Sequence, residues 1–186
     1  MRHIISIVLS ISVLFGFGEC AKVPLEVAVD FSKKGTVYET DFQAPWNIWG
    51  SLVEFYILVR TPDVRFASDE ERGIRNYILN GHPHKSTPRI KMKITLSPLG
   101  RASENITVIL DSKEWRNRKE KHYTEGQKIE EIVSVPLYGD GYGKRLIIAD
   151  LQRLRNYHVR VESLENIELP KEVSTYFIIN KFSTKH

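Results

Sequence analysis

Apolar and polar residues alternate along most of the chain with a period of two, the pattern of β-strands that bury one face. The clearest example runs from Arg89 to Leu96, where Ile90, Met92, Ile94 and Leu96 alternate with basic residues and a threonine. This segment is therefore predicted to be a strand with one face on a core and the other in solvent.

Seven further segments alternate in the same way or form short apolar runs, so about eight strands are expected in all. They are residues 38–44, 51–60, 106–110, 129–137, 144–149, 157–162 and 175–182. Turn-forming residues separate them, for example at 33–35, 98–100, 139–141 and 169–170.

One segment departs from the strand pattern. Ser68 and Glu71 have the spacing of a capping box, and acidic residues in a first turn favour the helix dipole. Ile74 and Ile78 lie four residues apart on a narrow apolar stripe, and the Asn-Gly pair at 80–81 ends it. We expect one short inserted helix near residues 68–80.

Many short strands, one helix and no alternation of strands with helices predict an all-β, mainly antiparallel fold. The architecture that fits is a β-sandwich, with a jelly roll as the topology to test. Neither an internal repeat nor a linker is found, so residues 21–186 are predicted to form a single β-sandwich domain.

Residues 1–20 have the three parts of an export signal: an early arginine, about a dozen apolar residues and a small-residue end. The apolar run is shorter than the roughly 20 residues of a membrane-spanning helix. We therefore expect an exported protein; in a bacterium this places it in the envelope, with the periplasm as its expected location.

Cys20 leaves two alternatives for the end of this signal. Cleavage before Ala21 would discard the cysteine, whereas in a bacterial lipoprotein the cysteine is lipidated and becomes the new N-terminus. Its position favours lipidation, but Glu19 is a poor match to the small residue expected before a lipidated cysteine. Membrane attachment is expected only through such an anchor at Cys20.

Composition limits the chemistry of the mature domain. From Ala21 onward there is no cysteine, which excludes internal disulfides, a thiolate nucleophile and a cysteine-based metal site. A formal net charge of +4 is compatible with an anionic partner or surface, but it falls short of a nucleic-acid-binding composition. No cofactor, no metal and no nucleic acid is expected.

The most basic stretch is the candidate binding element. It runs from residue 115 to 123 between two predicted strands, as a loop in which cations alternate with aromatic residues. Such a loop can bind phosphate, a lipid headgroup or an acidic protein surface. The candidate partner-binding residues are Trp115, Arg116, Arg118, Lys119, Lys121 and Tyr123.

Three other features are weaker candidates. His82 and His84 have a metal-compatible spacing, but no third ligand lies nearby in the sequence. The glycine-rich segment 139–143 precedes a predicted strand rather than the helix of a phosphate loop, so a tight turn is expected. Trp46 and Trp49 can stack on a sugar if exposed, but burial at the end of the sandwich is the favoured interpretation.

Several of these segments resemble an uncharacterised family of small exported proteins of Gram-negative bacteria, domain of unknown function 5625. The resemblance rests on residues 30–35, 39–42, 110–114 and 157–164, which are strand and turn signatures spread over most of residues 29–182. It implies an exported protein, often a lipoprotein, and it carries no catalytic residues.

No nucleophile elbow, zinc-protease motif or recognisable carboxylate pair occurs. The function expected is that of a non-enzymatic protein-binding module, such as an immunity or adaptor protein, whose partner is another envelope protein or an incoming one. The alternatives are a glycan- or lipid-binding module and, third, a hydrolase with an unfamiliar site.

Overall fold

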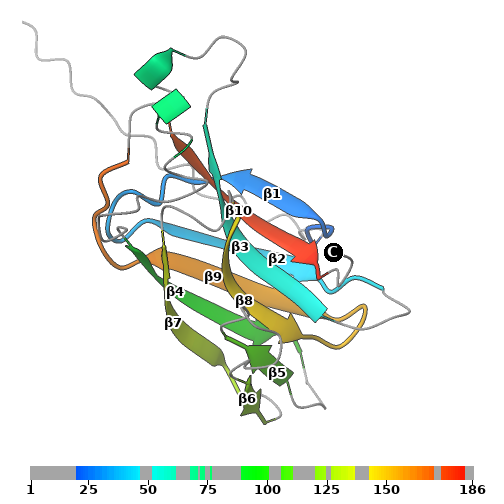
Figure 1. Cartoon of the computed structure of the whole chain (residues 1–186). Coiled ribbons are helices and arrows are strands. Elements are labelled where there is room, and N and C mark those ends of the chain that lie inside the picture. The colour runs from blue at the N-terminus through cyan, green and yellow to red at the C-terminus, as the bar shows by residue number, and fades with distance from the viewer. Residues whose placement is uncertain are drawn as a thin grey trace, which may run out of the picture.

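The structure, a computed structural model, describes residues 20–46, 52–61, 68–70, 72–73, 76, 89–100, 106–110, 120–124, 127–136, 143–169 and 173–182. These residues form ten strands in two sheets that pack face to face (Figure 1), and every pairing between strands is antiparallel. The strands are β1 (Leu25–Ala28), β2 (Val37–Gln43), β3 (Leu52–Arg60), β4 (Arg89–Pro98), β5 (Ile106–Ile109), β6 (Glu120–Tyr123), β7 (Ile129–Pro136), β8 (Gly143–Asp150), β9 (Asn156–Ser163) and β10 (Ser174–Lys181). The predicted all-β sandwich is confirmed.

The order of the strands defines the topology. One sheet has six strands in the order β1-β10-β3-β8-β5-β6, and the other has four in the order β2-β9-β4-β7. Without β5 and β6, the remaining eight strands form two four-stranded sheets, and the chain changes sheet at each step from β1 to β4 and from β7 to β10. This is the strand order of a jelly roll, the topology that the sequence singled out.

The hairpin β5–β6 is an addition to this jelly roll. It lies in the chain between β4 and β7 and extends the six-stranded sheet beyond β8, at the bottom of the view in Figure 1. Two strands were not predicted. β1 is only four residues long, and β6 falls in the polar stretch that was expected to be a loop.

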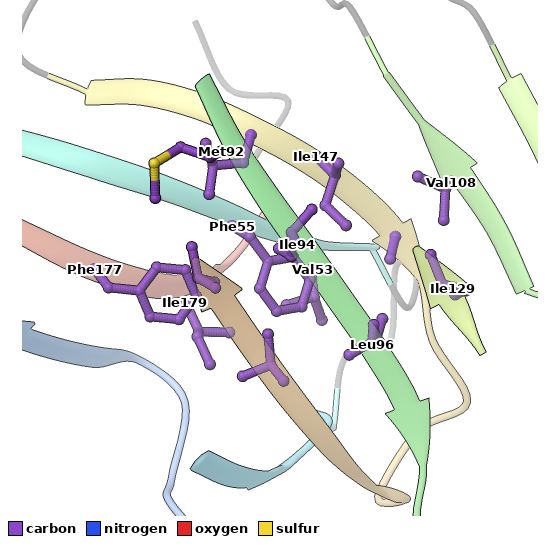
Figure 2. Close-up of a cluster of buried hydrophobic side chains, with 14 of the residues drawn as sticks. Val53, Phe55, Met92, Ile94, Leu96, Val108, Ile129, Ile147, Phe177 and Ile179 are labelled. Atoms are coloured by element: carbon purple, nitrogen blue, oxygen red, sulfur yellow. The ribbon is translucent and has the colours of Figure 1, made fainter. Parts of the chain in front are cut away.

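Inward-facing residues of the two sheets meet in one hydrophobic core. The predicted inward face of β4 is confirmed, because Ile90, Met92, Ile94 and Leu96 are all buried, whereas Thr95, predicted on the solvent face, is buried as well. Figure 2 shows Met92, Ile94 and Leu96 facing Phe55, Phe177 and other residues of the six-stranded sheet. Burial of this apolar area is the main source of stability for a fold without disulfides.

Aromatic rings fill the centre of this core. The ring of Phe42 lies 5.7 Å from Phe55 in an edge-to-face arrangement and 5.9 Å from Tyr157, with which it stacks. Phe55 in turn lies 6.5 Å from Phe177. Four rings from both sheets therefore form a continuous aromatic layer.

The expected helix is present in the described part of its range. Residues 69–70, 72–73 and 76 are helical, and the amide of Arg72 donates to the carbonyl of Ser68 at 3.0 Å. Two predicted turns are also confirmed, because Gly35 and Gly100 have φ values of 82° and 86° that suit glycine.

Candidate functional site

Only part of the candidate basic segment, residues 115–123, belongs to the described part of the chain. Trp115, Arg116, Arg118 and Lys119 lie outside the described residues, whereas Lys121 and Tyr123 belong to β6. The register of β5 and β6 pairs Val108 with Lys121, and Val108 is a core residue, so this face of β6 is turned toward the other sheet. The expectation of a loop at these two residues is corrected, since they form an edge strand.

Both side chains are engaged with Glu131 of β7. Lys121 Nζ lies 2.8 Å from each carboxylate oxygen, and the Tyr123 hydroxyl donates to Oε1. Glu131 faces the interior and only 4% of the residue is exposed. Because β6 and β7 belong to different sheets, these three residues, which we name the clasp, join the sheets where their edges meet.

The clasp changes the titration of Tyr123. Burial raises the pKa of the phenol above its ordinary value, and the hydrogen bond to Glu131 and the negative charge of that carboxylate raise the pKa further. The neutral phenol is therefore the form that fits the folded protein. The partner-binding role of Lys121 and Tyr123 stays a prediction, but their polar groups already have an intramolecular acceptor.

A second group of aromatic and cationic side chains lies on the outer face of the six-stranded sheet. Tyr56 and Leu58 of β3 face outward beside Tyr176 of β10, because their neighbours in β3 are buried in the core. The Arg60 guanidinium lies 4.4 Å from the centroid of the Tyr176 ring and reaches Glu26 of β1 at 2.7 Å. We name this set, with Glu26, the tyrosine face.

The tyrosine face is partly desolvated although it lies outside the core. Burial raises the pKa of Tyr56, the charges of Glu54 and Glu26 raise it further, and a hydrogen bond with Asn180 opposes the shift. Its aliphatic and aromatic side chains are half-buried rather than freely solvated. Two tyrosines and an arginine of this kind are the residues that most often dominate protein–protein interfaces.

Next to it, the outer side of β8 is covered by a cation–π contact. Arg145 lies 5.4 Å from the centroid of the Phe182 ring and 3.3 Å from Glu54. Along the direction of the strands, Ile148 lies between the level of Arg145 and the level of Phe182. Ile148 has no exposed surface. The six-stranded sheet therefore buries apolar side chains on both of its faces.

The outer face of the four-stranded sheet has a different chemistry. Acidic and basic side chains alternate across β2, β9, β4 and β7, and most of them form ion pairs. These pairs join Arg160 to Glu39 and Glu162 at 3.2 Å each, Lys93 to Glu130 at 2.8 Å, and Lys91 to Glu165 at 3.6 Å. The hydrogen bond from Lys93 lowers the pKa of Glu130. We name this surface the charged face.

The charged face contains the pair that bears on the hydrolase alternative. His158 Nδ1 lies 2.7 Å from Asp41 Oδ1, the contact that orients a catalytic histidine in a serine hydrolase. Ser97 lies opposite His158 in the register of β4 and β9, but no hydrogen bond joins these two described residues. Both members of the pair are exposed to solvent on a sheet surface. The hydrolase alternative stays a prediction, and Asp41 and His158 fit a hydrogen-bonded pair of the charged face.

Cys20 lies against the fold. Ala21 forms a parallel bridge with Phe42, and its amide donates to the carbonyl of Asp41 at 2.9 Å. The possible lipidation site is thus the residue directly before the first backbone contact of the sandwich. Whether Cys20 is lipidated stays a prediction.

The expected burial of Trp46 is wrong. Trp46 follows the end of β2 and is 59% exposed, with the Arg153 guanidinium 5.8 Å from the ring centroid. The backbone leaves the sheet after Ala44, which is buried, so Trp46 extends beyond the core instead of closing its end. Trp49 lies outside the described residues.

The remaining sequence candidates, His82, His84 and the glycines at 139 and 141, also lie outside the described residues. Within the described ranges, no cluster of three or more histidine, cysteine, aspartate or glutamate side chains could hold a metal ion. Among the same residues, no helix has the length and apolar character needed to cross a membrane.

Comparisons with known proteins add one finding. No protein-family model matches the sequence, and no curated protein matches it. The fold is similar to the crystal structure of a protein from Sulfurospirillum deleyianum, with a TM-score of 0.51 over 87% of this chain and 99% of that chain. The two sequences are 13% identical, so the similarity concerns the fold alone. The resemblance to the domain of unknown function 5625 stays a prediction.

Proposed function

We propose that this protein is a non-enzymatic binding module of the bacterial envelope, which uses the tyrosine face to bind another protein. The observation that carries the proposal is the arrangement of Tyr56, Arg60 and Tyr176 on regular strands. An immunity or adaptor protein is the concrete form, and the partner is an envelope protein or an incoming one.

The order of this face supports the proposal. The Arg60 guanidinium is held between the Tyr176 ring and the Glu26 carboxylate, so its orientation is fixed before a partner arrives. Side chains that are ordered in the free protein lose less conformational entropy on binding. Rigid strands beneath them limit the rearrangement further.

The composition of the face also fits a protein partner. Tyrosine and arginine each bring apolar area together with polar groups, and the aliphatic Leu58 between them adds apolar contact. Glu26 offsets the charge of Arg60, so the face is close to neutral and does not require an anionic ligand. Export is supported by residues 1–20, with their early arginine and apolar run.

Capture of a partner from envelope extracts tests the proposal, with identification of the captured protein by mass spectrometry. The variant Arg60→Ala should capture the partner at least about tenfold less well than the unmodified protein, as expected for an interface hot spot. The matched control is Arg160→Ala, which removes an arginine from the charged face and should capture as much partner as the unmodified protein.

The proposal is overturned if no protein is captured, or if Arg60→Ala and Arg160→Ala capture the same amount as the unmodified protein. Thermal unfolding of both variants accompanies the capture. Arg60 is half-exposed, so its removal should leave the fold intact.

A further inference from the structure

Three apolar side chains from separate segments are exposed at one end of the sandwich. Trp46 follows β2, Leu99 follows β4, and Leu154 lies in the turn between β8 and β9, with exposed fractions of 59%, 39% and 52%. Backbone hydrogen bonds connect these segments: the amide of Leu154 donates to Ala44, and the amide of Leu99 donates to Asn156. The apolar end, defined as Trp46, Leu99 and Leu154, is therefore built by adjoining parts of the fold.

The backbone conformation of Leu154 is a second, independent observation that indicates a contact outside the molecule. Its φ of 57° lies in the left-handed region, which a leucine adopts only at an energetic cost. The conformation is held from both sides, since its amide donates to Ala44 and its carbonyl accepts from Gln43 Nε2 at 3.1 Å.

The two hydrogen bonds join this turn to the end of β2, but the exposed leucine side chain takes no part in them. Asparagine or glycine would adopt this backbone conformation more readily and would leave no apolar side chain in water. A strained leucine that is half-exposed therefore points to a contact outside the molecule.

The charges around the apolar end are mainly positive. Arg153 lies over the Trp46 ring, and Arg155 follows in the same turn. Lys22 adjoins the bridge between Ala21 and Phe42, and the acidic residues among the described neighbours are Asp41, which precedes Phe42, and Asp150 at the end of β8. An apolar tip with an excess of cations among its described neighbours matches the boundary between anionic headgroups and acyl chains.

We propose that the apolar end rests on the surface of an anionic lipid bilayer, with Trp46, Leu99 and Leu154 in the headgroup layer and Arg153 beside lipid phosphates. Tryptophan is enriched at this depth because its ring is apolar and its N–H is polar. This surface is separate from the tyrosine face, so either can bind without the other.

The position of Cys20 agrees with this orientation. The bridge at Ala21 attaches the chain to the last residues of β2. One of these residues, Gln43, lies three residues before Trp46 in the sequence. An acyl chain on Cys20 and the apolar end can therefore reach the same membrane. The contact itself does not require the acyl chain.

Flotation with lipid vesicles tests the contact on the full chain carrying Cys20→Ala, so that no acyl chain contributes. Vesicles of about three parts phosphatidylethanolamine to one part phosphatidylglycerol supply the anionic surface, and pure phosphatidylcholine vesicles serve as the neutral comparison. The protein should bind the anionic vesicles, and higher salt should weaken this binding. Trp46→Ala should reduce it about tenfold, and Arg153→Ala about fivefold.

Two further variants separate this contact from a structural role. Leu154→Asn should bind the vesicles less well and yet unfold at a higher temperature, because asparagine relieves the backbone strain. Ile132→Thr removes a side chain that is 60% exposed on β7, away from the apolar end, and should leave vesicle binding unchanged.

The proposal is overturned if the Cys20→Ala protein does not bind anionic vesicles, or if Trp46→Ala and Leu154→Asn bind as well as their parent. It is also overturned if Ile132→Thr lowers binding as much as they do. Capture of an envelope protein through the apolar end, without vesicle binding, would make this end a protein interface instead. None of these results affects the test of the tyrosine face.

Discussion

The outer faces of the two sheets are covered by different kinds of side chain. The charged face of the four-stranded sheet covers its backbone with ion pairs that remain in contact with solvent, such as Arg160 with Glu39. The six-stranded sheet buries Ile148 and Ile178 on its outer side and places tyrosine and arginine beside them. The first surface is suited to solvent, and the second has the composition of an interface.

This difference shows that apolar side chains are buried on the outer side of the six-stranded sheet as well as between the two sheets. Ion pairs at an exposed surface contribute little to stability, typically about 0–1 kcal/mol each. Removal of an aliphatic side chain from water contributes more, roughly 1.5–3 kcal/mol for full burial. The outer side of the six-stranded sheet should therefore respond to substitution like part of a core.

The largest loss of stability in this comparison is expected for a substitution in the interior. Met92→Asp places a carboxylate where the native side chain has no exposed surface. We expect a loss of more than about 4 kcal/mol in the free energy of unfolding, enough to prevent folding of a domain of ordinary stability. Circular dichroism and solubility of the purified variant measure this loss. A folded variant would show that this face of β4 is misassigned.

Ile148→Asp tests whether the outer side of the six-stranded sheet behaves like the interior. Ile148 has no exposed surface and lies between Arg145 and Phe182, so the new carboxylate would be desolvated. We expect a loss of about 3 kcal/mol, lower than for Met92→Asp because Arg145 lies close by. Urea denaturation measures the change. A loss below about 1 kcal/mol would contradict the comparison, since this value is typical of exposed sites.

The clasp between the sheets should become visible at alkaline pH. The pKa of Tyr123 is raised in the folded protein, so above the ordinary value of 10.0 the unfolded chain loses this proton first. The stabilisation is therefore complete below pH 10.0 and is lost as the pH rises through the folded pKa. Between pH 10 and 11 the unmodified protein should lose more stability than Tyr123→Phe, by up to about 1 kcal/mol. Denaturation at both pH values measures the difference, and parallel curves would contradict the prediction.

The smallest effect is expected on the charged face. Lys91→Asp removes the ion pair with Glu165 and places two carboxylates near each other, but both side chains are about half-exposed. We expect a loss of about 0.5 kcal/mol that shrinks further as salt screens the repulsion. Urea denaturation at low and high salt provides the measurement. A loss equal to that of Met92→Asp would mean that the two faces of β4 were assigned wrongly.

The strands were predictable where one face is buried and the other is not. In β4 the sequence alternates strictly, and the structure buries the predicted residues. β6 was not predicted because Glu120 to Tyr123 has no apolar alternation. Its inward side chains are a lysine and a tyrosine, which are held by a hydrogen-bonded carboxylate rather than by apolar contact.

The candidate site was less predictable than the fold for a related reason. Tyr56 and Tyr176 lie 120 residues apart in the numbering and become neighbours only through the pairing of β3 with β10. In the sequence, Glu131 stands out only as a charged residue at an inward position of an alternating strand. Assigning each residue of this strand to the inward or the outward face would have revealed the inward carboxylate. The exposure of Trp46 depends on where β2 ends, and strand ends are the least certain part of a sequence-based prediction.

The buried carboxylate of Glu131 has a consequence for how β7 avoids wrong partners. β7 is the edge strand of its sheet, and edge strands tend to pair with strands of other molecules. A shift of its pairing by one residue would move Ile132 inward and turn Glu131 away from Lys121 and Tyr123. A carboxylate that faces inward on an edge also makes this strand a poor template for aggregation. The clasp therefore selects one register for β7 and lowers the tendency of the protein to form fibrils.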